Sequence, residues 1–223
     1  MGRGPEARLV MMILPLRTLA VVSIAAGAFL MPNVWSLLIY DRDAIIAGEF
    51  WRVASGALVH LTPAHFIFNL VAFAAAGWVI EQRAYPHYWL VGGLTALLGG
   101  AVLFVAAPGI TRYGGLSGVA VGLIAYASLC GMREEGPWQR VSKVVFALII
   151  LKTAVELLTG QTPMTAGGAA HFVPVPMSHA IGVLVGVMVA LNPYRPAGKL
   201  TRSGTVPIKQ ATRHWSPAGS SLI

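Results

Sequence analysis

The residues Tyr-Gly-Gly-Leu-Ser-Gly-Val-Ala-Val-Gly, numbers 113–122, open an apolar segment that runs on to Met132. The serine of this stretch, Ser117, is costly in lipid unless another polar group meets it. The candidate partner is His179, near the start of a later apolar segment. Because polar side chains within the bilayer are tolerated around water, we expect the two to meet in a wet cavity.

The composition is that of a membrane protein. Of 223 residues, 56% are hydrophobic and only 11% are charged, which argues against a soluble domain and fits a polytopic membrane protein. The one cysteine, Cys130, excludes an intramolecular disulfide framework and a thiolate zinc cluster. The net charge is +8, but the basic residues lie in short loops and in the tail, so they indicate membrane orientation and no nucleic-acid partner.

Hydropathy predicts an all-α protein with six transmembrane helices. The expected spans are residues 18–40, 62–80, 88–106, 115–132, 141–158 and 177–191. Residues 1–17 then form a basic N-terminus, 18–193 the six-span domain, and 194–223 a basic tail of disordered composition. We expect Pro32 to kink or fray the first span without ending it. A cleaved signal peptide is the alternative for this span, but the apolar run is longer than a typical signal core.

The distribution of Lys and Arg predicts the orientation. Twelve of them fall in loops and ends on the side of the N-terminus, and three, Arg42, Arg52 and Arg112, fall on the other side. Since positive loops stay inside, both termini are predicted to be cytoplasmic.

Three polar residues share one predicted depth. His65, Ser117 and His179 each lie 16 residues before a charged residue at the inner end of their span, as from 117 to 133. At about 1.5 Å per residue they lie about 24 Å above the inner boundary, or about 6 Å below the outer surface of a core about 30 Å thick. Asn69 lies one turn below His65 on the same face.

This polar layer contains the groups that amide hydrolysis needs. Ser117 is a candidate nucleophile and His179 a candidate general base. We expect no acid in the layer, so the prediction is a Ser–His dyad. Ser117 also lies in the first turn of its helix, where unpaired N–H groups favour an oxyanion, and His65 and Asn69 supply further donors.

Small residues suit a close helix contact beside these groups. Gly118 and Gly122 are four apart on the fourth span, and Gly182 and Gly186 are four apart on the sixth, on the stripe of His179. Such faces let two backbones approach closely.

Each signal also has a plain structural explanation. A glycine pair is usually helix packing, a membrane serine often bonds to its own helix, and His65 with Asn69 can be an interhelical hydrogen bond. His60 precedes a helix start and fits a water-facing loop. Lys152 and Glu156, four apart on the fifth span, are predicted to be a buried ion pair that orders the fold rather than catalytic groups.

Together, the motifs resemble the rhomboid intramembrane serine proteases. The resemblance covers roughly residues 50–193 and includes Trp51-Arg52, the spacing His60-x4-His65-x3-Asn69, Gly115-Leu116-Ser117-Gly118, and His179-x2-Gly182-x3-Gly186. It implies a six-helix bundle with a short fourth span, Ser117 as nucleophile and His179 as base. It further implies an oxyanion hole from His65, Asn69 and the Ser117 backbone, with His60 in support.

Within that family the chain is similar to the rhombosortases. The shared features are residues 48–52, residues 60–65, and the stretch 152–160 with Glu156. The resemblance implies a bacterial inner-membrane protein that needs no cofactor or metal and whose site opens to the periplasmic side. Its implied substrates are single-span membrane proteins with a Gly-rich C-terminal motif.

Two other classes of function stay open. A non-catalytic rhomboid-like protein that binds client transmembrane segments would be expected to lack the nucleophile or the base, and this chain has both. A transporter is less favoured, because there is no repeated pair of broken helices and no expected acid in the polar layer. A zinc protease is less favoured still, because no His-Glu-x-x-His motif occurs.

Overall fold

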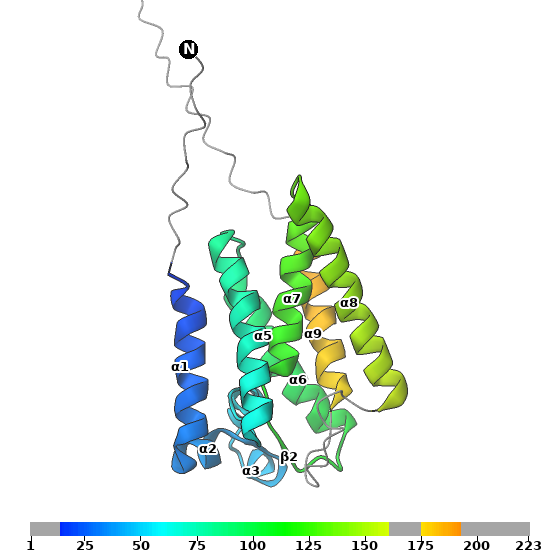
Figure 1. Cartoon of the computed structure of the whole chain (residues 1–223). Coiled ribbons are helices and arrows are strands. Elements are labelled where there is room, and N and C mark those ends of the chain that lie inside the picture. Colours follow the sequence, from blue (N-terminus) through cyan, green and yellow to red (C-terminus); the bar gives the residue numbers. More distant parts are fainter. Residues whose placement is uncertain (1–13, 161–174, 193–223) are drawn as a thin grey trace, which may run out of the picture. The chain divides into compact units, whose positions relative to one another are not determined.

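The computed structural model describes residues 14–160 and 175–192, which are mostly helical (Figure 1). The predicted tail and most of residues 1–17 and of the loop before the last helix lie outside this part. The elements in chain order are α1 (Leu16–Leu30), α2 (Pro32–Leu38), β1 (Tyr40–Asp41), α3 (Arg42–Ile46), α4 (Arg52–Ser55), the 3-10 helix η1 (Gly56–Leu58), α5 (Pro63–Gln82), α6 (Tyr88–Ala106), β2 (Arg112–Tyr113), α7 (Ser117–Gly131), α8 (Pro137–Thr159) and α9 (Pro176–Leu191).

Helix α7 is the centre of the bundle. It packs against α5, α6, α8 and α9, and most of its 15 residues are buried. Its buried side chains Leu123 and Tyr126 join Phe73 and Ile80 of α5 and Val185 of α9 in the main hydrophobic core. In Figure 1 the long helices stand side by side around it.

The first predicted span is broken, and the expectation of a mere kink at Pro32 was wrong. α1 ends at Leu30, Met31 is extended at φ −114° and ψ 101°, and α2 leaves at 110° to α1. Proline disfavours the helical conformation of the residue before it and lacks an N–H, yet it fits the first turn of a new helix. Pro32 therefore ends one helix and starts the next.

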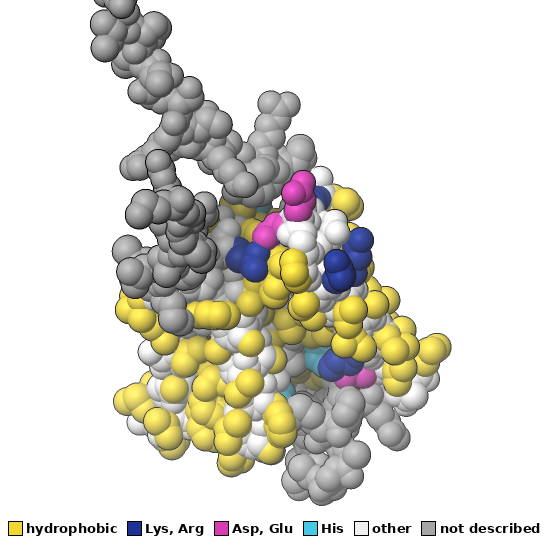
Figure 2. All heavy atoms as spheres, turned by 45° about the horizontal axis from the view of Figure 1, so that its top comes forward, with side chains coloured by type: hydrophobic (Ala, Val, Ile, Leu, Met, Phe, Trp, Pro, Cys, Tyr) yellow, Lys and Arg dark blue, Asp and Glu magenta, His cyan; other side chains and the backbone are white. Residues whose placement is uncertain are grey.

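The described helices differ in whether they are long and apolar enough to cross a membrane. Within the described ranges, α5 and α6 are long and apolar enough to cross a bilayer, and α1 with α2 is a third candidate if the bent pair counts as one span. α7 and α9 are apolar but have only 15 and 16 residues, and α8 carries charged residues. The outer surface supports an integral membrane protein, because hydrophobic side chains cover most of the described face seen in Figure 2. The count of six spans stays a prediction.

The start of α5 is capped by Thr62 and Pro63. The Thr62 side chain accepts a hydrogen bond from the backbone N–H of His65 at 3.2 Å, and Pro63 is the first helical residue. This start sets the direction of α5 and places His65 and Asn69 in its first two turns.

Residues 40–58 form a compact connection that supports the entry to α7. β1 pairs antiparallel with β2, with Tyr40 opposite Tyr113. The Arg52 guanidinium binds the carbonyl oxygens of Ser36 and Ile39 at 2.7 and 3.0 Å and the Glu49 carboxylate at 2.6 Å. These contacts satisfy a buried charge and tie α4 to the end of α2 and to the chain before β1.

Candidate active site

The chain enters α7 through an extended segment held by residues 56–60. The Gly115 N–H donates to the Gly56 carbonyl at 3.2 Å, and the Leu116 N–H donates to His60 Nε2 at 3.4 Å. Gly115 has φ of 144°, a conformation that favours glycine. Ser117 is therefore the first residue of α7, where backbone N–H groups lack intrahelical partners.

The backbones of α7 and α9 touch beside Ser117 and His179. A Cβ added at Gly118 would lie 2.9 Å from the Ser178 carbonyl oxygen, and one added at Gly182 would collide with the Gly118 carbonyl oxygen. Further along the contact, a Cβ at Gly186 would lie 2.5 Å from the Gly122 oxygen. No residue larger than glycine fits at this contact between α7 and α9, which we call the seam. The seam brings the first turns of both helices together.

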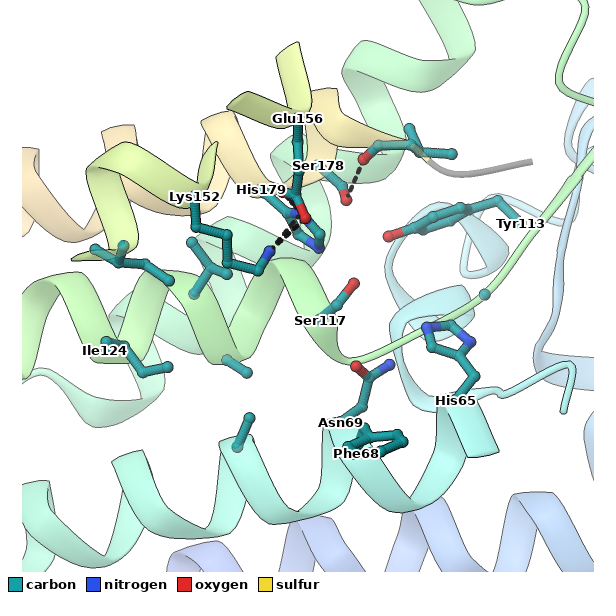
Figure 3. Close-up of a pocket in the computed structure, with 16 residues that line it drawn as sticks. His65, Phe68, Asn69, Tyr113, Ser117, Ile124, Lys152, Glu156, Ser178 and His179 are labelled. Atoms are coloured by element: carbon teal, nitrogen blue, oxygen red, sulfur yellow. Dashed lines mark hydrogen bonds and ion pairs between the residues drawn. The ribbon is translucent and has the colours of Figure 1, made fainter. Parts of the chain in front are cut away.

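Ser117 and His179 lie on the wall of one cavity of about 330 Å³. Figure 3 shows both side chains directed into it, with His65 and Asn69 of α5 on the opposite wall. In the described part of the chain, no hydrogen bond joins the Ser117 and His179 side chains. Because both side chains line the same cavity, a reacting group in it has access to both.

These residues fall inside the match to a known family. Residues 47–194 match the family model described as Rhomboid domain, which is more than half of the chain. The chain belongs to the rhomboid family. This family is one of intramembrane proteases, so the match supports a membrane-embedded hydrolase, and the matched range includes every predicted site residue from His60 to Gly186.

The base candidate of this rhomboid domain has a carboxylate beside it, so the expectation of no acid in the polar layer was wrong. Glu156 Oε2 lies 2.7 Å from His179 Nδ1. The predicted Lys152–Glu156 ion pair is confirmed, because Lys152 Nζ lies 2.7 Å from Glu156 Oε1. The same Nζ lies 3.4 Å from His179 Nδ1. The three groups form one cluster on the cavity wall (Figure 3).

A signal for Glu156 was present in the sequence. α8 runs opposite to α5, α7 and α9, so depth along it is counted forward from the end that the sequence predicts to be the inner one. Glu156 lies 16 residues after Arg140, the same interval that separates the other polar residues from their inner charges. The rise of about 1.5 Å per residue thus gives Glu156 the depth of His179.

Two polar side chains of α5, those of Asn69 and His65, lie on the side of the cavity opposite His179. Asn69 is buried, and its Nδ2 has no partner among the described residues. A Cβ added at Gly115 would lie 2.6 Å from His65 Cε1 and 3.3 Å from Asn69 Nδ2, so both side chains lie against the peptide that precedes Ser117. An unpaired amide N–H₂ beside a helix N-terminus is suited to an oxyanion.

His60 is a buried support of the segment before Ser117. Its side chain is 1% exposed, and its Nε2 accepts from the Leu116 N–H, so a water-facing loop position is excluded. Burial, with a smaller effect of His65, lowers the pKa of His60 to about 3. The ring is therefore neutral at physiological pH and serves as an acceptor.

Tyr113 is a cavity residue that the motifs did not identify. It lines the cavity, and its hydroxyl points inward in Figure 3. Burial raises the pKa of Tyr113, while hydrogen bonding to Ser178 and Ser117 works against that rise. Its place depends on the pairing of β2 with β1, for which the sequence held no clear signal. Another histidine of the sequence, His171, lies outside the described residues.

Proposed function

We propose that the protein is an intramembrane serine endopeptidase that uses Ser117 as nucleophile and His179 as general base. The observation that carries this proposal is that both side chains line a cavity of about 330 Å³ whose opposite wall holds the unpaired Asn69 amide. Nucleophile, base and oxyanion donors thus surround one space large enough for a peptide group.

The reaction follows from these positions. His179 takes the Ser117 proton while the Ser117 oxygen attacks the scissile carbonyl carbon, giving a tetrahedral oxyanion. His179 then gives the proton to the leaving amine, the C–N bond breaks, and an acyl-enzyme remains on Ser117. A water, deprotonated by His179, hydrolyses this ester and restores the serine.

The oxyanion would be stabilised by fixed donors. Asn69 lines the cavity together with Ser117, the first residue of α7, and His65 lies beside Asn69 against Gly115. Such donors are worth most where water is scarce, and removing one costs about 10²- to 10³-fold in rate.

A second cavity supports a substrate that arrives within the membrane. About 290 Å³ lies between α5, α7 and α8, with a lining that is almost wholly apolar. Ala72 and Ile124 line both cavities, so an apolar path leads along these helices to Ser117. A single transmembrane segment unwinding at one end would fit such a path, because apolar walls replace the lipid around it.

The resemblance supports a substrate class, and the charge distribution supports a location in the membrane. The rhombosortase-like stretches favour single-span proteins with a Gly-rich C-terminal motif. The distribution of Lys and Arg favours cytoplasmic termini and a site that opens to the periplasmic side of a bacterial inner membrane.

The test compares cells that carry the wild-type chain with cells that carry Ser117→Ala. We expect mass spectrometry of membrane and released proteins to find new termini, close to the outer end of a transmembrane segment, only with the wild type. The same fragments in Ser117→Ala cells at matched expression would overturn the proposal. Capture of intact clients by both forms, with no fragments from either, would instead favour a client-binding protein.

A further inference from the structure

Glu156 is the most deeply buried ionisable group at the cavity. The residue as a whole is 1% exposed, in a helix with apolar residues on both sides of it along the chain. Both of its oxygens are engaged, Oε2 with His179 at 2.7 Å and Oε1 with Lys152 at 2.7 Å. A charge held this deep is costly unless each oxygen has a donor, and the two donors come from two different helices.

The distances assign the proton on His179. A carboxylate oxygen only accepts, so a bare Nδ1 at 2.7 Å would place two lone pairs face to face. Nδ1 therefore carries the hydrogen and donates it to Glu156. The Lys152 ammonium, at 3.4 Å, is the weaker neighbour of the ring. Nε2 is then the bare nitrogen that is able to take a proton from Ser117.

The geometry points to Glu156 as the positioning acid of a Ser117–His179–Glu156 triad, an inference that rests on the proposed function and deepens it. In Figure 3 the imidazole lies between the Glu156 carboxylate and Ser117. When Ser117 attacks, its proton moves to Nε2, and Nδ1–H stays on the ring. Glu156 stays ionised and offsets the positive charge that the ring gains, as an acid behind a catalytic histidine does.

Lys152 holds the carboxylate in place from its other side. Its side chain is 39% exposed and reaches the cavity, whereas that of Glu156 is 2% exposed. The other titratable groups on the cavity wall are His65, across the cavity on α5, and Tyr113 of β2. The competing explanation is that Glu156 serves only as the buried partner of Lys152. The two explanations predict different labelling rates once both charges are removed.

The experiment uses the purified full chain in detergent with a fluorescent alkyl fluorophosphonate as the probe. The probe forms an oxygen–phosphorus bond to Ser117, fluoride leaves, and the serine proton passes to His179, so labelling reports the same proton transfer as cleavage. Labelling rates over a range of probe concentrations separate kinact from KI. The variants are Glu156→Gln, Lys152→Met, their double variant, and Ser117→Ala. Glu134→Gln, which removes the ion pair with Arg83 at another site, is the matched control.

We expect Glu156→Gln to lower kinact by about 10²- to 10⁴-fold with KI unchanged, because the glutamine can donate to Nδ1 and select the wrong tautomer. Lys152→Met should keep more than a tenth of the wild-type kinact, and Glu134→Gln should match wild type. The double variant leaves no unpaired buried charge, so it should fold even if the single glutamine variant does not. It should be as slow as Glu156→Gln.

Three results would overturn the triad. The first is a kinact of Glu156→Gln within threefold of wild type, and the second is a loss of kinact in Lys152→Met as large as that in Glu156→Gln. The third is recovery of kinact in the double variant. Each of them would make Glu156 only a structural ion-pair partner of Lys152. Absence of Ser117-dependent labelling in the wild type is a different outcome, because it would overturn the proposed function itself.

Discussion

The two sides of α7 are packed in opposite ways. Toward α9 the backbones touch, and Gly118 and Gly182 leave no room for a Cβ. Toward α5 and α8 the side chains leave cavities of about 330 and 290 Å³. One helix therefore has a closed seam on one side and open space on the other.

This difference separates two tasks. The closed seam fixes the relative position of Ser117 and His179, because packed backbones do not shift by small amounts. The open side gives a bulky substrate a place next to the same serine. The first task calls for rigidity and the second for space, so substitutions on the two sides should have different effects.

The largest effect is expected on the open side, at the proposed oxyanion donor. Asn69→Ala should lower kcat by about 10²- to 10³-fold with little change in KM, because the lost hydrogen bond forms mainly in the transition state. Steady-state cleavage of a substrate identified by mass spectrometry gives both constants. A change confined to KM would contradict the assignment.

A methyl group in the closed seam should harm both stability and activity. Gly182→Ala places a Cβ against the Gly118 carbonyl and should cost about 1–3 kcal/mol of stability. Since a displacement of about 1 Å at a catalytic pair costs about 10²-fold, labelling of Ser117 should fall by a similar factor. Thermal unfolding in detergent and fluorophosphonate labelling measure the two effects.

Gly93→Ala is the matched control for the seam, because no atom lies within 4 Å of a Cβ built at this position of α6. It should leave labelling unchanged and stabilise the protein by about 0.5–1 kcal/mol, since alanine is favoured over glycine within a helix. Equal damage from both substitutions would remove the argument for a special contact between α7 and α9.

Filling the apolar cavity should affect large substrates more than small probes. Ala75 lines the space between α5, α7 and α8, and Ala75→Leu should lower kcat/KM for a membrane-spanning substrate by about tenfold. Fluorophosphonate labelling should not change, because the small probe does not need this space. Val71→Leu on the exposed face of α5 is the control, and an equal loss there would exclude a substrate path along the cavity.

The smallest effect near neutral pH is a pH dependence of stability from His60, which develops only in acid. Its pKa is about 3 in the folded chain and about 6.5 when unfolded, so the unfolded state binds the proton first. The stabilisation is complete above pH about 6.5 and is lost as the pH falls toward 3. His60→Gln keeps an acceptor for Leu116 and does not titrate, so its melting temperature should fall less steeply below pH 6.5. Parallel pH profiles for both proteins would contradict this role.

Local signals predicted much of the fold. The limits of α5 and α6 lie close to the expected ones, because Thr62 and Pro63 mark one start and Ala107-Pro108-Gly109 follows the other end. The prediction at Pro32 was wrong because a proline can either bend or end a helix, and the sequence around it does not say which.

By itself, the sequence predicted which polar residues share one depth, since helical rise is constant and each predicted span carries a charge at its predicted inner end. It also carried the rhomboid motifs that the family match supports. Only the tertiary structure decided that Glu156 meets His179. A helix in lipid is apolar on nearly every face, so periodicity does not select the face that packs, and the rotation of α8 against α9 is set by side-chain contacts between the two helices.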